Sequence, residues 1–309
     1  MTAEGFPKHD DSGQDADVAR RLTRHPYRCA MRWGDMDAQA HINNVSFLDY
    51  LQEARVHFLL TGPVVMRDLL ATGVLVVSHQ VEYVAPVEFG SAPLVVELWV
   101  DAVGGSRFVI GYDVFDSGVL AARARTAAVP FDLATQTLRR LSPEERTVLS
   151  DGVAPTSALS VLPRVRIGGT LHRFPLALRW SDLDSYGHVN NVRYFDYLQE
   201  ARIALIVEVL GWTDEDVWLV VRQDIDYLRP MDFRLEPYEV ATMVTAIGNR
   251  SFRLAVEIRD PGSGDVFASA RTVVVGAVPL SETRRAALSQ YLAAASAPDS
   301  PEHAAHSLG

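Results

Sequence analysis

Apolar and polar positions follow the same order twice along the chain. In each half a predicted opening strand, YRCAMRW from Tyr27 and FPLALRW from Phe174, leads into a polar stretch and then a helix-like stretch. Apolar side chains recur there at steps of three and four, which predicts a helix of about 16 residues and roughly 25 Å. The stripe comprises Phe47, Tyr50, Leu51, Ala54 and Phe58 in the first half, and Tyr194, Tyr197, Leu198, Ala201 and Leu205 in the second.

Segments rich in Val, Ile, Tyr and Phe follow each helix and predict strands. They span 74–84, 93–103, 106–116 and 119–130 in the first half, and 217–228, 236–246, 250–260 and 265–276 in the second. Turn sequences such as VGGS and DPGSG separate them, and few helices intervene, so we expect antiparallel sheets. A short helical piece closes each half, from Ser142 and from Ser281.

The two halves are copies of one domain. Residues 31–59 align without a gap with residues 178–206, with 15 identities in 29 positions. The likeness continues through VEYVAPVEF from Val81 and IDYLRPMDF from Ile225. We expect domains at 23–150 and 166–296, a linker at 151–165, and disordered tails at 1–22 and 297–309. A long helix followed by antiparallel strands, twice, predicts an α+β fold in which a curled sheet wraps each helix.

A polar loop precedes each helix: DMDAQAHINN, residues 35–44, is the first polar loop, and DLDSYGHVNN, residues 182–191, is the second. With its flanks the repeat reads R-W-x-D-x-D-x-x-x-H-[IV]-N-N-x-x-[FY]-x-x-[YF]-x-x-E-A-R. This pattern resembles the hotdog-fold acyl thioesterases of the 4-hydroxybenzoyl-CoA thioesterase type. The resemblance covers both halves and implies a tandem double hotdog that hydrolyses an acyl thioester without a metal or another cofactor.

The same resemblance implies where the sites lie. Hotdog sites form between two hotdog units, so the halves are expected to pair as an internal dimer with two quasi-equivalent sites, and further self-association is expected. The second aspartate of the D-x-D pair is the family's base or nucleophile, which carries over to Asp37 and Asp184. Asn43 and Asn190 match family positions that face the reacting carbonyl.

The residue types fit that chemistry. Thioester hydrolysis needs a group that activates water or attacks the carbonyl, and donors that stabilise the oxyanion. A carboxylate beside a helix N-terminus can do the first, and the exposed amides there can do the second. His41 and His188, four residues after Asp37 and Asp184, are candidates to orient the carboxylate, to donate to the carbonyl or to fix the loop.

Other residues of the repeat have structural interpretations. Asp35 and Asp182 are expected to bond local backbone, and Asn44 and Asn191 to be plain helix caps. Glu53, Arg55, Glu200 and Arg202 are expected on the polar side of the helix or at its edge, in a structural ion pair or buried hydrogen bond. A helix glutamate is the base in another branch of hotdog thioesterases, so Glu53 and Glu200 stay open as alternatives. Cys29 is expected to be a buried, inert thiol, and His25 and His172 receive no role. Ala40 stands where the second loop has Gly187, so the two sites are expected to differ in geometry or activity.

Composition then argues against several classes of partner and site. A net charge of −10, with Lys8 as the only lysine, makes a nucleic-acid partner a poor fit. The single cysteine excludes an internal disulfide and a cysteine-built zinc site. Apolar runs are too short to insert into a membrane, and the N-terminus has no secretory pattern, so we expect a cytoplasmic protein.

Three alternatives to an acyl-CoA thioesterase stay open at this point. The substrate carrier could be an acyl carrier protein, because the thioesterases that act on such carriers are also double hotdogs. A hotdog hydratase is disfavoured because its signature places the histidine five residues after the aspartate and not four. A non-catalytic acyl-thioester binder is disfavoured because both halves keep the complete polar loop.

Overall fold

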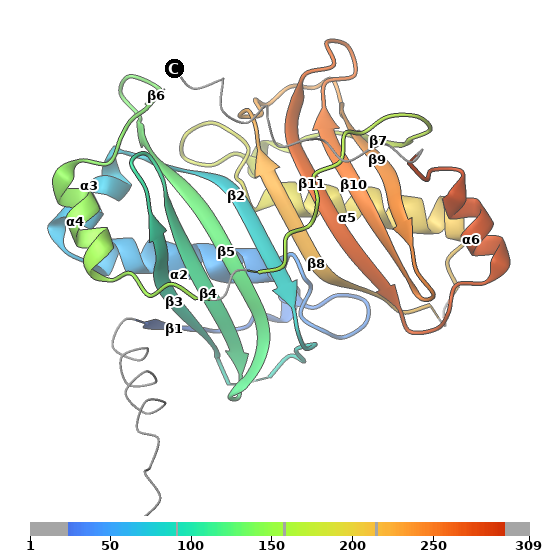
Figure 1. Cartoon of the computed structure of the whole chain (residues 1–309), viewed down its shortest axis with the longest axis horizontal. Helices are drawn as coiled ribbons and strands as arrows, with labels where there is room; N and C mark the ends of the chain where they lie inside the picture. Colours follow the sequence, from blue (N-terminus) through green and yellow to red (C-terminus); the bar gives the residue numbers. More distant parts are fainter. Residues whose placement is uncertain (1–23, 91, 157–158, 214–215, 294–309) are drawn as a thin grey trace, which may run out of the picture.

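The computed structural model describes residues 24–90, 92–156, 159–213 and 216–293 (Figure 1). The expected tails at 1–22 and 297–309 lie outside these residues, and the domain boundaries stay a prediction. Within the described residues, no helix is long and apolar enough to cross a membrane.

The described part of the first half contains three α-helices and six strands. Its elements are β1 (His25–Cys29), α2 (Ser46–Thr61), α3 (Val64–Thr72), β2 (Val74–Tyr83), β3 (Leu94–Val103), β4 (Phe108–Asp116), β5 (Val119–Asp132), β6 (Thr137–Leu138) and α4 (Pro143–Asp151). The second half contains β7 (His172–Leu176), α5 (Arg193–Leu205), a π-helical continuation (Ile206–Leu210), β8 (Trp218–Tyr227), β9 (Tyr238–Ile247), β10 (Ser251–Arg259), β11 (Val266–Gly276) and α6 (Glu282–Ser289).

The predicted helices and strands are confirmed, with two corrections. The opening strands are shorter than expected, because the chain turns into a 3₁₀ turn at Trp33–Asp35 in the first half and at Trp180–Asp182 in the second. Helix α3 and the short strand β6 were not predicted from the sequence. Both elements belong to the first half, and both become walls of the pocket described below.

One antiparallel sheet runs through both halves in the order β1-β3-β4-β5-β2-β8-β11-β10-β9-β7, with β6 beside β5. Strands β2 and β8 join the halves, with Gln80 opposite Asp224. Figure 1 shows α2 and α5 together behind the curled sheet. Their buried faces, with Leu48, Leu51 and Phe195 among the most enclosed side chains, pack on the inner face of the strands. This is the double hotdog that the sequence predicted.

Candidate active site

Each polar loop is closed by its own backbone. The N–H of Asp37 donates to the carbonyl of His41 at 2.8 Å, and the N–H of Asp184 donates to that of His188 at 2.8 Å. The residue before each histidine has a left-handed backbone, with φ of 62° at Ala40 and 80° at Gly187. Both loops therefore make the same left-handed turn before the histidine, with alanine there in the first loop and glycine in the second.

The two aspartates favoured for chemistry sit in these loops with one carboxylate oxygen engaged. Oδ1 of Asp184 accepts the N–H of Tyr186 at 2.8 Å. Oδ1 of Asp37 accepts the N–H of Gln39 at 2.8 Å and that of His41 at 3.2 Å. Within the described residues neither Oδ2 has a hydrogen-bond partner, so each carboxylate keeps one oxygen for a ligand or a water.

Asp35 and Asp182 have the structural role that the sequence predicted. Oδ2 of Asp182 accepts the N–H of Arg179 at 2.8 Å and the hydroxyl of Tyr197 at 2.8 Å. The corresponding oxygen of Asp35 accepts the N–H of Arg32 at 2.7 Å and the hydroxyl of Tyr50. Each aspartate thus ties the 3₁₀ turn to the long helix of its own half through one carboxylate oxygen.

The two asparagines of each loop have different partners. Oδ1 of Asn190 accepts the N–H of Val192 at 3.0 Å, which is a capping bond at the start of α5, and Asn43 does the same for Val45. Asn191, expected to be the cap, reaches the other half, where its Oδ1 lies 3.1 Å from Nε2 of His79. Asn44 likewise accepts from Arg202 of the second half at 3.4 Å.

The charged end of the DYLQEAR repeat divides into an exposed and a buried part. Glu53 and Glu200 are exposed, as the polar-side expectation required. Arg55 and Arg202 are buried, at 6% and 7% exposure, at the edge of the apolar stripe, and Arg55 makes a buried hydrogen bond as expected. Each arginine stands four residues after a stripe leucine and three before the next large apolar position.

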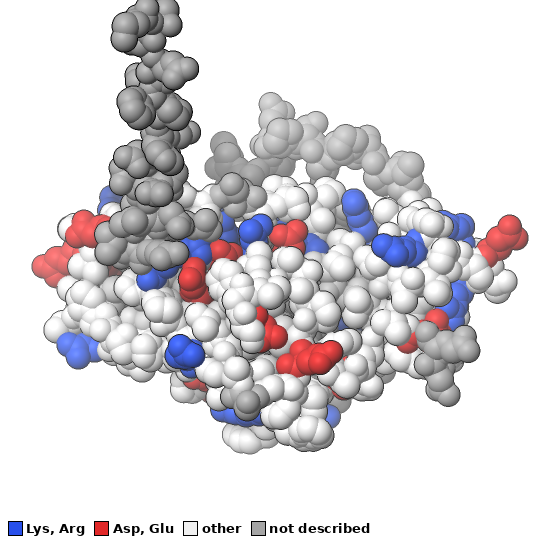
Figure 2. All heavy atoms as spheres, turned by 90° about the horizontal axis from the view of Figure 1, so that it is seen from below, with Lys and Arg blue, Asp and Glu red and all other residues white. Residues whose placement is uncertain are grey.

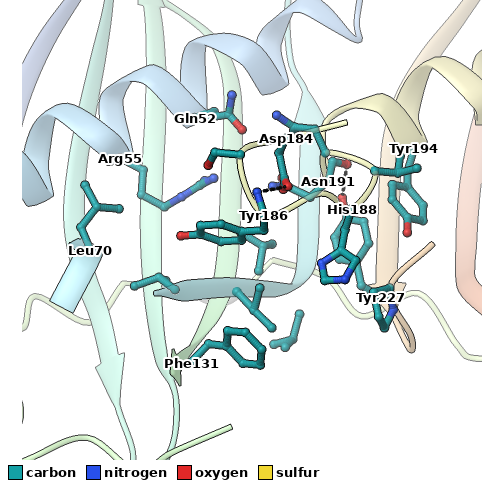
Figure 3. Close-up of a pocket in the computed structure, with 18 of the residues that line it drawn as sticks. Gln52, Arg55, Leu70, Phe131, Asp184, Tyr186, His188, Asn191, Tyr194 and Tyr227 are labelled. Atoms are coloured by element: carbon teal, nitrogen blue, oxygen red, sulfur yellow. Dashed lines mark hydrogen bonds between the residues drawn. The ribbon is translucent and has the colours of Figure 1, made fainter. Parts of the chain in front are cut away.

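The buried arginines face the site between the halves. Nη1 of Arg55 donates to the Tyr112 hydroxyl at 3.4 Å, and the residue lines the pocket opposite the second polar loop (Figure 3). Burial lowers the pKa of Arg202 to about 10, which leaves it protonated at neutral pH. Each long helix therefore sends a cation toward the polar loop of the other half.

A pocket of about 630 Å³ lies between the two halves. The second half supplies its polar side, with Asp184, His188, Asn190 and Asn191. The first half supplies an apolar wall from α2, α3, β2 and the β5–β6 hairpin, namely Leu59, Leu70, Val74, Leu75, Val76, Phe131 and Leu138. Figure 3 shows Asp184, His188 and Asn191 on one side and Leu70 and Phe131 on the other. A polar group beside an apolar recess suits a ligand with a reactive head and an apolar tail.

The corresponding space beside the first polar loop is built differently. Trp218 begins β8 where Val74 begins β2, and its indole is 9% exposed and packs on Phe252. The side-chain amide of Gln39 lies 3.5 Å from the Trp218 carbonyl. In the described part of the second half no helix follows α5 as α3 follows α2, and no strand pairs with β11 as β6 pairs with β5.

The two histidines of the polar loops are half-buried. Nε2 of His188 lies 3.9 Å from Oδ1 of Asp232, an exposed side chain, and His188 lines the pocket. Nδ1 of His41 is buried without a hydrogen-bond partner in the described part of the chain. Each ring is therefore close to its loop but not locked to the candidate aspartate.

Two further residues that the sequence singled out lie away from the pocket. Cys29 is buried, and burial raises the pKa of its thiol to about 11, so the inert-thiol interpretation is confirmed. His172 is buried on β7 and lies 2.9 Å from Glu208. Among the residues that the structure describes, no group of three or more His, Cys, Asp or Glu side chains is arranged to hold a metal ion.

Solved structures share this architecture. The 12:0-ACP thioesterase from Umbellularia californica matches with a TM-score of 0.68 and 17% identity, over 82% of this chain and 94% of that one. An acyl-ACP thioesterase from Bacteroides thetaiotaomicron matches at 0.62 and 14%, over 82% and 98%. A putative oleoyl thioesterase from Lactobacillus plantarum matches at 0.64 and 15%, over 84% and 96%. At these identities the similarity shows the double hotdog fold.

Sequence comparison gives the family. The uncharacterized protein YsmA of Bacillus subtilis is 31% identical over 84 residues, which is 26% of this chain, and the chain spans about half (54%) of that relative's length. The profile of the Thioesterase-like superfamily matches residues 31–155 and again residues 178–296. Each match contains one polar loop, one long helix and the strands that wrap it. The chain therefore belongs to the Thioesterase-like superfamily, as two tandem copies of its domain in one double hotdog, and the predicted family and fold are confirmed.

Proposed function

We propose that this protein hydrolyses acyl-CoA thioesters to a carboxylic acid and free CoA, with Asp184 as the reacting carboxylate. The observation that carries the proposal is the pocket between the halves, in which a carboxylate with one unengaged oxygen lies across from a largely apolar wall. The acyl chain would lie against Leu59, Leu70 and Val74, with its thioester carbon beside Asp184.

Two routes are open to Asp184. As a general base it takes a proton from water while the water oxygen attacks the carbonyl carbon. The tetrahedral intermediate then expels the thiolate, which takes up that proton. As a nucleophile its oxygen attacks the carbonyl, the carbon–sulfur bond breaks, and water cleaves the resulting mixed anhydride. In both routes the carbonyl oxygen gains negative charge, and we assign its stabilisation to His188, Asn190 and nearby backbone N–H groups.

The routes differ in where the oxygen of water enters. A single turnover in ¹⁸O-labelled water places the label in the released acid if Asp184 is a base. On the anhydride route, label also enters the Asp184 side chain when water attacks its carbonyl carbon. Mass spectrometry of the peptide that contains Asp184 therefore tests the nucleophile route.

The first polar loop carries the same groups, and Asp37, His41 and Asn43 are proposed as the equivalent set. We propose that this site contributes less to turnover, because Trp218 and the missing counterparts of α3 and β6 leave it without the recess that the Asp184 site has. The asymmetry supports one principal site per chain.

CoA is the carrier that we favour over a carrier protein. Figure 2 shows a face on which acidic and basic side chains are interspersed among many uncharged ones, without a broad basic area. With its net charge of −10, the chain offers little long-range attraction for an acidic protein partner. We further propose a cytoplasmic location and an internal dimer of the two halves as the working unit.

Turnover assays of four proteins test the proposal: the wild type, Asp37→Asn, Asp184→Asn and the double variant, with acyl-CoA of increasing chain length and the same acyl groups on a carrier protein. We expect Asp184→Asn to lose nearly all activity and Asp37→Asn to keep most of it. Full activity in a folded double variant would refute the mechanism. Hydration of an enoyl-CoA without hydrolysis, or acyl-CoA binding without turnover, would instead support one of the alternative functions.

A further inference from the structure

His79 is a buried histidine behind the pocket that the mechanism above does not use. It lies on β2 of the first half, is 1% exposed, and has a partner on each ring nitrogen. Oγ1 of Thr126 is 2.9 Å from Nδ1, and Oδ1 of Asn191 is 3.1 Å from Nε2. The second of these bonds crosses from the first half to the second polar loop.

The hydrogen-bonding chemistry of these partners determines which ring nitrogen of His79 carries the hydrogen. A carboxamide oxygen can only accept, so Nε2 of His79 carries the hydrogen that Asn191 Oδ1 receives. Nδ1 is then a lone pair, and it accepts the hydroxyl hydrogen of Thr126. Burial and the nearby Arg55 cation lower the pKa of His79 to about 3, so the ring stays neutral and keeps this arrangement across the neutral pH range.

This pairing determines which way the Asn191 amide points. Its oxygen is occupied by His79, so its two N–H bonds are the polar groups that remain for another partner. Asn191 and Asp184 line the same pocket, and both are labelled in Figure 3. An amide nitrogen held there is a hydrogen-bond donor in the pocket of the carboxylate that is proposed to react.

We propose that Nδ2 of Asn191 donates to the thioester carbonyl oxygen in the Asp184 site, and that His79 is the positioning residue that orients this amide. The inference rests on the proposed function and adds one donor to it. As the carbonyl becomes tetrahedral its oxygen becomes an oxyanion, and a donor already fixed in place stabilises that charge without reorganising. His79 does not touch substrate, and it acts only through Asn191.

The other half lacks the same device. Gln223 stands at the position of His79 and Asn44 at that of Asn191. Both polar atoms of the Gln223 side chain are buried without a hydrogen-bond partner in the described residues, and so is Nδ2 of Asn44. The Asn44 oxygen accepts from Arg202, so in that half the asparagine has an arginine as its partner in place of a histidine. Orientation of the amide by a neutral, buried histidine is thus specific to the Asp184 site.

Steady-state kinetics with an acyl-CoA substrate test the inference. Asn191→Ala should lower kcat by about 10²-fold to 10³-fold, the usual effect of removing one oxyanion donor. His79→Asn cannot place a donor at the position of Nε2 and should lower kcat as well, with a smaller change in KM. His79→Gln places an amide N–H near that position and should recover most of the lost kcat. Gln223→Asn, the matched change in the other half, should leave kcat unchanged.

A double variant separates positioning from a merely structural role. If His79 acts through Asn191, adding His79→Asn to Asn191→Ala should lower kcat no further. Wild-type kcat in Asn191→Ala, or the same loss from His79→Asn in both backgrounds, would overturn the inference. If a thermal melt shows that His79→Asn does not fold, the kcat values of the remaining variants still test the inference. Asn191→Ala and Asn191→Ser should lose kcat, and His79→Gln should keep most of it. An inactive wild type, or Asp184→Asn with full activity, would instead refute the proposed function.

Discussion

Ala40 and Gly187 occupy the same position in the two polar loops, one residue before the histidine, and both have a left-handed backbone. The loop shape therefore does not depend on which residue stands there. For a residue with a Cβ this conformation costs about 1–2 kcal/mol. The first half bears that cost at Ala40, and the second avoids it with glycine.

The free energy of unfolding should report this difference. A Cβ on Gly187 would have nothing within 4 Å, so Gly187→Ala should lose about 1 kcal/mol through backbone strain alone. Ala40→Gly should be neutral or gain a few tenths of a kcal/mol, because relief of strain is partly offset by a more flexible unfolded chain. Urea denaturation measures both. Gly168→Ala, which also has open space and no left-handed φ, is the control, and a loss there equal to that of Gly187→Ala would contradict the explanation.

The length of acyl chain accepted should depend on Val74. Val74 lines the pocket where the other half has Trp218, so Val74→Trp should fill part of the recess. We expect kcat/KM to fall by about tenfold or more for the longest accepted acyl-CoA and to change little for the shortest, since each methylene in such a pocket contributes about 1 kcal/mol or more. Val119→Trp adds the same indole at an exposed site and should leave the chain-length profile unchanged. If kcat/KM of Val74→Trp fell equally for acyl-CoA of every length, the acyl chain would not lie against Val74.

Acid should destabilise the fold through His79. In the unfolded chain a histidine binds a proton below about pH 6.5, whereas burial keeps folded His79 neutral down to a pKa of about 3. The unfolded state then binds more protons in this window, so stability falls as pH drops from 6.5 toward 3, by up to about 1.4 kcal/mol per pH unit. Urea unfolding at pH 7 and pH 5 should show His79→Gln losing about 2 kcal/mol less than the wild type over that interval. If the free energies of unfolding of the wild type and His79→Gln fell by the same amount between pH 7 and pH 5, His79 would be protonated in the folded protein at pH 5.

The bonds from Asp35 and Asp182 to tyrosine should matter for stability and not for chemistry. Tyr197→Phe removes the hydroxyl that donates to Asp182 at 2.8 Å and should lower the free energy of unfolding by about 1.5–3 kcal/mol, as for a hydrogen bond to a charged group. Its kcat should stay close to that of the wild type at a temperature where both are folded. Tyr50→Phe is the counterpart in the first half. A drop in kcat comparable to that of Asp184→Asn would assign Asp182 a part in the reaction.

Much of the fold could be predicted from the sequence because its patterns are local. The long helices follow from apolar steps of three and four, and the strands from β-branched and aromatic runs. Helix α3 was missed because Gly62-Pro63 marks a break just before it and its apolar residues merge with those of β2. Strand β6 has two residues, too few for any periodicity.

The site was less predictable because its decisive contacts join distant parts of the chain. The sequence singled out Asp184 and gave Asp182 its structural role. It did not show that Asn191 would turn toward His79 while Asn190 capped the helix, because two adjacent asparagines satisfy the same local rule. Nor could it show that Arg55 would line the pocket opposite the second polar loop, since that depends on how one half packs on the other.

The pairing of β2 with β8 has a consequence for how substrate enters. The pocket lies between halves that backbone hydrogen bonds join into one sheet, so the halves cannot swing apart as hinged domains do without breaking that ladder. Entry and release must use smaller displacements, such as those of side chains and of the β5–β6 hairpin at the rim. The spacing of the two halves around the pocket is thus fixed by the sheet, and access to it depends on short elements that, among the described residues, only the first half has.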